Sequence, residues 1–198
     1  MTTSVTESIV EGLRATSPTE GVAVVLGLAY VVLVARHSRW GWVAGGLSSA
    51  LFAWLFIAAR LPMQSLLQVY YVAMAVYGWR HWSRGGPEQP VIRLPWRVHA
   101  AGIGVSLVLG FAVAGLLARE TQAAAPLLDS VTTMVSLFAT WLVARKVLEN
   151  WLYRLVVDCL QAVLFASQGL WFTALLFVLY LGTSIGGYVS WRRTYRSQ

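Results

Sequence analysis

The chain of 198 residues is 58% hydrophobic, carries only 12% charged residues and contains ten tryptophans. Since a soluble domain holds about 25% charged residues, this composition excludes an ordinary soluble protein and predicts a membrane protein. The net charge of +7 comes from arginines dispersed among short polar segments, so we expect it to orient the chain in the membrane and not to bind nucleic acid.

Residues 1–20 are rich in threonine, serine and glutamate and lack a basic leader segment, so no cleaved signal peptide is expected. Seven apolar stretches follow, and each is a candidate transmembrane helix, because a bilayer core about 30 Å thick needs about 20 helical residues. In chain order they cover 21–35, 40–59, 64–82, 98–117, 127–143, 150–167 and 171–191. The single cysteine, Cys159, lies inside the sixth stretch, so no disulfide framework is expected.

Polar and aromatic side chains gather on helical faces in the second and third stretches. The second contains Trp42 and Ser48, and the third places Gln68 and Tyr71 three residues apart on one face. The fourth stretch differs, because it offers only Ser106 and several glycines. We interpret it as a connector helix.

Polar residues return in the last three stretches. The sixth stretch places four of them along one helical face: Asn150, Arg154, Asp158 and Gln161. Asp158 falls about 12 Å along the helix, near the membrane midplane, where an aspartate costs about 2.5–3.5 kcal/mol. The seventh adds Tyr180 and Thr183. Polar faces on several helices predict one shared central pathway, although hydroxyls often bond their own helix and Asp158 could simply pair with Arg154.

The sequence also repeats itself, because a shift of 109 positions aligns residues 28–84 with 137–193 without a gap. The shift maps the first three stretches onto the last three, which begin four crossings later and therefore on the same side of the membrane. We predict an all-α integral membrane fold with a 3+1+3 arrangement, in which two parallel three-helix bundles are joined by a connector. Residues 1–198 would form one domain, with repeats at 21–82 and 127–191 and the connector at 98–117.

The predicted topology leaves three lysines and arginines on the side of the N-terminus and twelve, Arg154 among them, on the other. By the positive-inside rule the C-terminus is cytoplasmic and the N-terminus outside. Six tryptophans near the cytoplasmic helix ends fit an interfacial aromatic belt: Trp40, Trp42, Trp79, Trp82, Trp151 and Trp191.

Motifs for catalysis and metal binding are missing from the sequence. A phosphate-binding loop would need a lysine in a glycine-rich segment, and the only lysine is Lys146. No H-E-x-x-H, paired-cysteine or G-x-S-x-G pattern occurs. We therefore expect no enzyme, no catalytic residue, no metal and no cofactor.

Several motifs resemble those of the PnuC family of vitamin transporters, in the family's order and over about 20–195. They are the runs L-L-Q-V-Y-Y at 66–71, Y-G-W at 77–79, A-R-K-V-L-E-N-W-L at 144–152, Q-G-L at 168–170 and G-Y-x-x-W at 187–191. The resemblance implies seven helices in two bundles, as in SWEET sugar transporters. It also implies uptake of a precursor of nicotinamide adenine dinucleotide, typically nicotinamide riboside, across the bacterial inner membrane. Family members work by facilitated diffusion, and a cytosolic kinase then traps the substrate.

The implied substrate suggests a binding site. A cationic aromatic ring needs flat aromatic partners, and Trp42, Tyr71, Trp151 and Tyr180 are candidates. Hydrogen bonds to a ribose would come from Gln68, Asn150 and Gln161, and Asp158 would attract the cation. Ser48 and Thr183 complete the predicted site. Because no arginine cluster lies at the midplane, a substrate without phosphate fits best.

Alternatives remain at this stage. Family relatives carry thiamine or riboflavin, and Ser48 and Asp158 stand where riboside-transporting members often have asparagine, so the vitamin stays undecided. A non-transporting membrane scaffold is a second class of function. The partners expected are the vitamin and the lipid bilayer, and a homo-oligomer is compatible with the sequence without being indicated by it.

Overall fold

The protein is all-helical in a computed structural model that describes residues 6–7, 10, 17–58, 62–84, 89–120, 126–167 and 171–198. Its seven long helices are α2 (Pro18–Ala35), α3 (Trp40–Ala58), α4 (Pro62–Arg84), α5 (Trp96–Glu120), α6 (Pro126–Ala144), α7 (Asn150–Ser167) and α8 (Trp171–Arg196). Each predicted stretch falls on one helix, which confirms the all-helical prediction. Residue 59, the expected end of the second stretch, and the Q-G-L motif lie outside the described residues.

Four helical segments are long and apolar enough by composition to cross a membrane, and they are Pro18–Ala35, Trp40–Ala58, Trp96–Leu116 and Ala174–Arg196. Within α6, Ser130–Ala144 forms a shorter apolar segment. Helices α4 and α7 are not among these segments, and both carry charged residues, such as Arg80 in α4 and Arg154 and Asp158 in α7.

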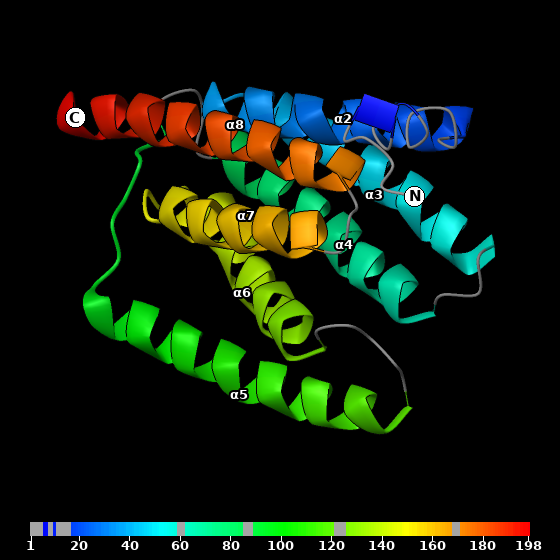
Figure 1. The fold of residues 1–198 in the computed structure, drawn as a ribbon. Coiled ribbons are helices and arrows are strands. Elements are labelled where there is room, and N and C mark those ends of the chain that lie inside the picture. The colour runs from blue at the N-terminus through cyan, green and yellow to red at the C-terminus, as the bar shows by residue number, and fades with distance from the viewer. Residues whose placement is uncertain are drawn as a thin grey trace.

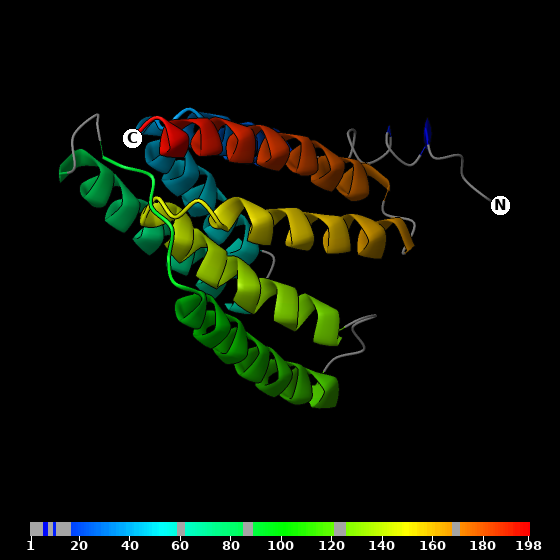
Figure 2. The same ribbon diagram turned by 90° about the vertical axis from the view of Figure 1, so that its left-hand side faces the viewer.

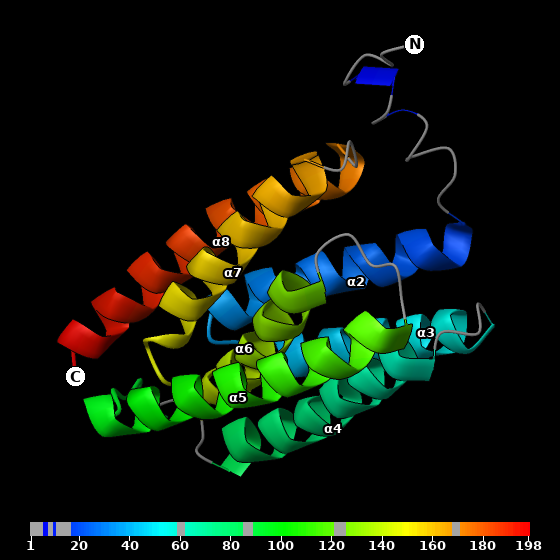
Figure 3. The same cartoon turned by 60° about the horizontal axis from the view of Figure 1, so that its bottom comes forward.

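Successive helices run in opposite directions, so that α2, α4, α6 and α8 all end on one side of the molecule (Figure 1). Helix α3 packs against α2 and α4, and α7 packs against α6 and α8. We call α2–α4 the first trio and α6–α8 the second trio. The two trios meet where α2 packs against α8 and α4 against α6. In the described part of the chain α5 packs mainly against α6, and its His99 also contacts Tyr153 of α7, with ring centres 5.8 Å apart. Helix α5 forms the lower edge of the molecule in Figure 1 and lies in front of the other helices in Figure 3.

The first helix of each trio ends in the same way. His37 and Lys146, which are 109 residues apart, both adopt positive φ angles, 59° and 54°. The N–H groups of Ser38 and Val147 each donate to a carbonyl five residues earlier at 2.9 Å, as in a Schellman motif. Such a left-handed residue ends a helix by satisfying its last carbonyl groups. The sequence repeat is therefore matched by a repeated backbone turn.

Hydrogen bonds between the trios are repeated as well. Trp82 at the end of α4 donates through Nε1 to the carbonyl oxygen of Ala144 in α6 at 3.0 Å. Trp191 in α8 donates in the same way to Val34 in α2 at 3.1 Å. We call these two contacts the crossed tryptophan bonds. Both lie at the side of the molecule where α2, α4, α6 and α8 end, and they join that side firmly.

Two further tryptophans belong to the core, and each packs on a glycine. A Cβ added at Gly78 would overlap the ring of Trp42, and one added at Gly187 would overlap that of Trp151. Trp42, Trp82, Trp151 and Trp191 are at most 3% exposed and form part of the main core. The expectation of an interfacial belt is therefore wrong for these four, although Trp40, at 59% exposed, fits it.

The segment before α5 is fastened to the turn between α6 and α7, which it crosses in Figure 2. Ile92 pairs with Val147 in an isolated parallel bridge. Lys146 is buried, donates to the carbonyl of Gln89 at 3.0 Å and lies over the ring of Trp82, 4.9 Å from its centre. The lysine thus joins this segment to the end of α4.

Candidate functional site

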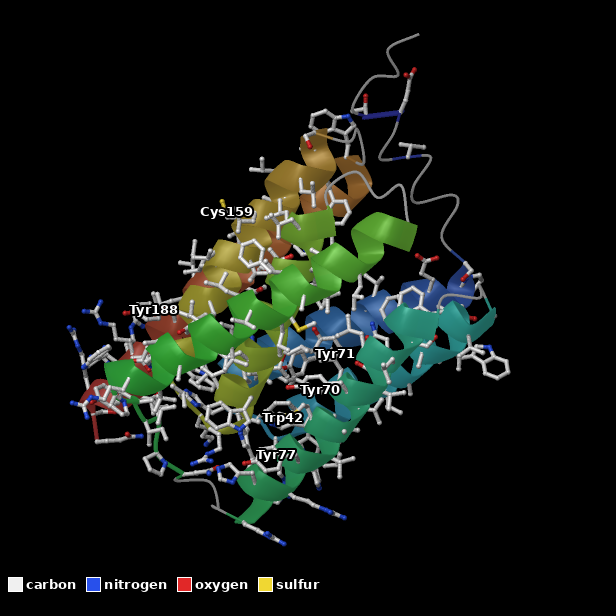
Figure 4. All side chains as sticks on the ribbon, turned by 90° about the horizontal axis from the view of Figure 1, so that it is seen from below. Trp42, Tyr70, Tyr71, Tyr77, Cys159 and Tyr188 are labelled. Carbon is white, nitrogen blue, oxygen red and sulfur yellow. The ribbon has the colours of Figure 1, made fainter. Side chains whose placement is uncertain are left out.

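A cavity of about 410 Å³ lies between the two trios, and its lining comes from six helices: α2, α3, α4, α6, α7 and α8. This volume is within the range of about 300–1,000 Å³ that is usual for small-molecule sites. Figure 4 shows Trp42 and Tyr71 pointing into the space between α4 and the helices of the second trio, and Cys159 on the outer side of α7. A polar cavity inside an apolar helical protein is the candidate functional site.

The first trio contributes aromatic rings and uncharged polar groups. Trp42 contacts Tyr30 edge to face, with ring centres 5.6 Å apart, and both line the cavity. The indole Nε1 of Trp42 is buried without a hydrogen-bond partner. Gln68 and Tyr71 of α4 line the same space. The hydroxyl of Ser48 also lines it, but it donates to the carbonyl of Ala23 at 2.7 Å. This half can therefore receive a flat ring and supply hydrogen bonds.

The second trio contributes the charged groups, which lie on α7. Arg154, Asp158 and Gln161 follow one face of this helix and all line the cavity. Asp158 is buried, and its Oδ2 accepts a hydrogen bond from the hydroxyl of Ser184 in α8 at 3.1 Å. The side chain of Gln161 donates to Thr132 at 2.9 Å, while its Oε1 stays without a partner. This half therefore offers one cation, one carboxylate and a free amide oxygen.

Two hydroxyl groups of α6 that line the cavity bond to their own helix, which is the plainer of the two interpretations. Ser136 donates to the carbonyl of Thr132, and Thr140 to that of Ser136, both at 2.8 Å within the helix. Their oxygens can still accept hydrogen bonds, and both residues line the cavity. They add polarity to the wall without offering a free donor.

Seven of the ten predicted site residues line this cavity: Trp42, Ser48, Gln68, Tyr71, Asp158, Gln161 and Tyr180. The other three, Asn150, Trp151 and Thr183, are not part of the lining. Asn150 is fully buried and donates to the carbonyl of Val147 at 2.6 Å. Trp151 packs against Trp191 in the core, and Thr183 donates to its own helix at Tyr180. These three residues have structural contacts within the helical framework and do not line the cavity.

The sequence-based site left out several residues that line the cavity, above all Arg154 and Tyr30. The sequence places Arg154 on the same helical face as Asp158, as a possible partner of that carboxylate and as a cytoplasmic charge, but the predicted site does not include it. Both side chains lie in the described part of the chain, and no ion pair within 4.0 Å joins them. Among the described residues, no group of three or more histidine, cysteine, aspartate or glutamate side chains is suited to hold a metal.

Comparison with known proteins gives a consistent result. The model of a family described as nicotinamide mononucleotide transporter matches residues 17–193. The nicotinamide riboside transporter PnuC of Escherichia coli is 26% identical over 90% of this chain and 87% of its own length. The riboflavin/roseoflavin transporter RibM of Streptomyces davaonensis is 28% identical over 84% of this chain and 81% of its own.

Among solved structures, the crystal structure of the vitamin B3 transporter PnuC superposes with a TM-score of 0.72. The match covers 98% of this chain and 88% of that one, at 24% sequence identity. At this identity the likeness establishes the fold.

Proposed function

Since the chain belongs to the nicotinamide mononucleotide transporter family, we propose that its cavity carries nicotinamide riboside across the bacterial inner membrane. The chain is a multi-pass membrane transporter, not an enzyme. The observation that supports the substrate class is the cavity itself, where aromatic and hydrogen-bonding side chains from both trios surround about 410 Å³ inside an otherwise apolar protein.

In this proposal the aromatic rings and the polar groups have separate tasks. Trp42 and Tyr180, from different trios, hold the pyridinium ring, because aromatic faces attract cations. Gln68 and Gln161 bind the ribose hydroxyls. Asp158 supplies the negative charge that balances the ring, and Ser184 keeps this carboxylate in place.

We propose that the 3+1+3 arrangement provides the transport mechanism. The first trio rocks against the second about the central cavity, which opens to one side of the membrane at a time. The repeated turns at His37 and Lys146 and the crossed tryptophan bonds support a twofold relation between the trios. The positive-inside rule places these bonds on the cytoplasmic side, so their breaking would open the cavity inwards.

Net uptake needs no ion gradient in this scheme. Substrate moves down its own gradient by facilitated diffusion, and a cytosolic kinase maintains the gradient by phosphorylating the riboside. Among the described residues that line the cavity there is one arginine and no lysine, so this lining lacks the several positive charges that a phosphate group would favour. The phosphorylated product would therefore not return.

A second candidate is riboflavin transport, which the similarity to RibM over 84% of the chain favours. Uptake into proteoliposomes that contain the purified protein separates the candidates, with labelled nicotinamide riboside, riboflavin and thiamine offered in turn. We expect saturable uptake of nicotinamide riboside. Uptake of riboflavin or thiamine alone would show that this vitamin, and not nicotinamide riboside, is the substrate. No uptake of any of the three would favour a non-transporting membrane scaffold.

A further inference from the structure

Arg154 has an unused binding capacity that the proposed function does not employ. Arg154 lines the cavity, yet the Nε of its guanidinium is buried and has no hydrogen-bond partner. A guanidinium carries five N–H donors in a planar fork, and a buried donor without an acceptor is unfavourable. An acceptor supplied by the substrate would remove this cost.

The nearest acidic group on the same helix does not serve as that acceptor. Asp158 lies one turn further along the same face, but no ion pair within 4.0 Å joins these two described side chains. The carboxylate instead accepts from Ser184 of α8 at 3.1 Å. The cavity therefore presents a separate positive and negative group side by side, and no other lysine, arginine, aspartate or glutamate belongs to its described lining.

We propose that Arg154 is a specificity-determining residue that binds a carboxylate carried on the aromatic ring of the substrate. Residues four apart on a helix have Cβ atoms about 5–6 Å apart, which suits a ring with its positive nitrogen near Asp158 and an acidic substituent near Arg154. A pyridinium riboside with a ring carboxylate is such a zwitterion. A planar guanidinium binds a carboxylate through two parallel hydrogen bonds, whereas a carboxamide offers it one neutral oxygen.

This inference rests on the proposed function, because it assumes that the cavity takes pyridinium ribosides. Within that class, the cavity prefers the carboxylate form to the carboxamide form. The carboxylate form has a charged partner for each of its two charges, Arg154 and Asp158, whereas the carboxamide form has one for its ring only. We expect the Kd values of the two forms to differ by about tenfold.

Calorimetric titration of the purified protein in detergent tests the proposal, with nicotinic acid riboside and nicotinamide riboside as probes. We expect the acid to bind about tenfold more tightly. Arg154→Gln should weaken binding of the acid about tenfold and change binding of the amide by less than about threefold. The matched control is Arg193→Gln, because Arg193 is exposed and lies outside the cavity lining.

The possible outcomes are distinct. Equal or tighter binding of the amide, or an equal loss for both ligands in Arg154→Gln, would overturn the role of Arg154 and leave the proposed function standing. Binding of neither riboside to the unaltered protein would overturn both. If Arg154→Gln does not elute as a folded protein, Arg154→Lys replaces it. Lysine keeps the charge and loses the planar fork, so part of the preference should survive.

Discussion

The indole nitrogen of Trp191 donates a hydrogen bond to the carbonyl oxygen of Val34, which lies 157 residues earlier in the chain, at 3.1 Å. The bond crosses from the second trio to the first, and Trp82 makes the reverse connection to Ala144 at 3.0 Å. The two donors are 109 residues apart, as the sequence repeat requires, and the two acceptors are one residue out of that register, so the bonds close one side of the cavity in a nearly symmetric way. If the trios rock apart on that side, both must break.

Replacing Trp82 or Trp191 with phenylalanine should loosen that side. Each variant keeps an aromatic ring but loses one hydrogen bond between the trios, which costs about 1 kcal/mol. For a chain of this size we expect the thermal midpoint in detergent to fall by about 2–4 °C per variant. Trp40→Phe is the control, because Trp40 is largely exposed. A double variant as stable as the parent would show that the bonds do not hold the trios together.

Alanine at Gly78 or Gly187 should be strongly destabilising, because the new Cβ would overlap the ring of Trp42 or Trp151. Overpacking of this kind costs about 1–3 kcal/mol. Gly186→Ala is a neighbouring control with nothing within 4 Å of the added Cβ. It should be neutral or stabilising, since alanine favours helix over glycine by roughly 1 kcal/mol. Thermal unfolding of the three variants tests this, and equal midpoints would contradict the close packing.

Stability should fall in mild acid because of His37, in the turn between α2 and α3. Burial, together with the nearby charge of Lys146, lowers the pKa of its imidazole from 6.5 to about 4. The ring stacks on Trp191 with centres 5.2 Å apart. Below pH 6.5 the unfolded chain binds a proton that the folded protein does not, so stability decreases as the pH falls from 6.5 towards 4.

The measurement for this prediction is the thermal midpoint between pH 7.5 and 4.5. His37→Asn serves as the comparison, because asparagine tolerates the φ of 59° at this position and does not titrate. The decline should be shallower in the variant. Parallel curves for variant and parent would remove His37 as the cause.

Gln68→Ala and Asp158→Asn should weaken binding of nicotinamide riboside while leaving the folded protein intact. Asp158→Asn removes the negative charge beside the pyridinium ring, and we expect a loss of about tenfold in affinity. Glu20→Gln is the matched control, since Glu20 lies in the first turn of α2 outside the cavity lining. Titration calorimetry gives the answer, and unchanged affinity in both cavity variants would mean that the substrate binds elsewhere.

Much of this fold could be predicted because the membrane allows few solutions. Apolar stretches bounded by prolines and charges had to become helices, and α7 begins and ends at the predicted residues, Asn150 and Ser167. The spacing of Gln68 and Tyr71, and of Asp158 and Gln161, was enough to place them on faces that meet. Sequence spacing fixes a helical face whatever the packing of the helices.

The features of the site that the sequence does not predict depend on contacts between helices that are far apart in the chain. Trp151 looked like a ligand or an interfacial residue, and only the packing against Gly187 and Trp191 makes it a core residue. From the sequence, Arg154 is interpreted as an orienting charge or as a partner of Asp158, because it lies near a helix end and one turn before that carboxylate. Its spacing to Asp158 was visible, but the absence of an ion pair between them depends on side-chain geometry that no sequence pattern specifies.

The central claim is that substrate occupies the cavity between the trios, and protection of a cysteine placed there tests it most directly. In a Cys159→Ser background, Ser49→Cys puts one thiol in the lining, and Ser190→Cys puts one outside it. At a concentration of nicotinamide riboside about ten times Kd, about nine tenths of the sites are filled, so the reaction of the cavity thiol with a small thiol reagent should slow about tenfold. The thiol at 190 should react as before. Equal rates at position 49 with and without substrate would contradict the account.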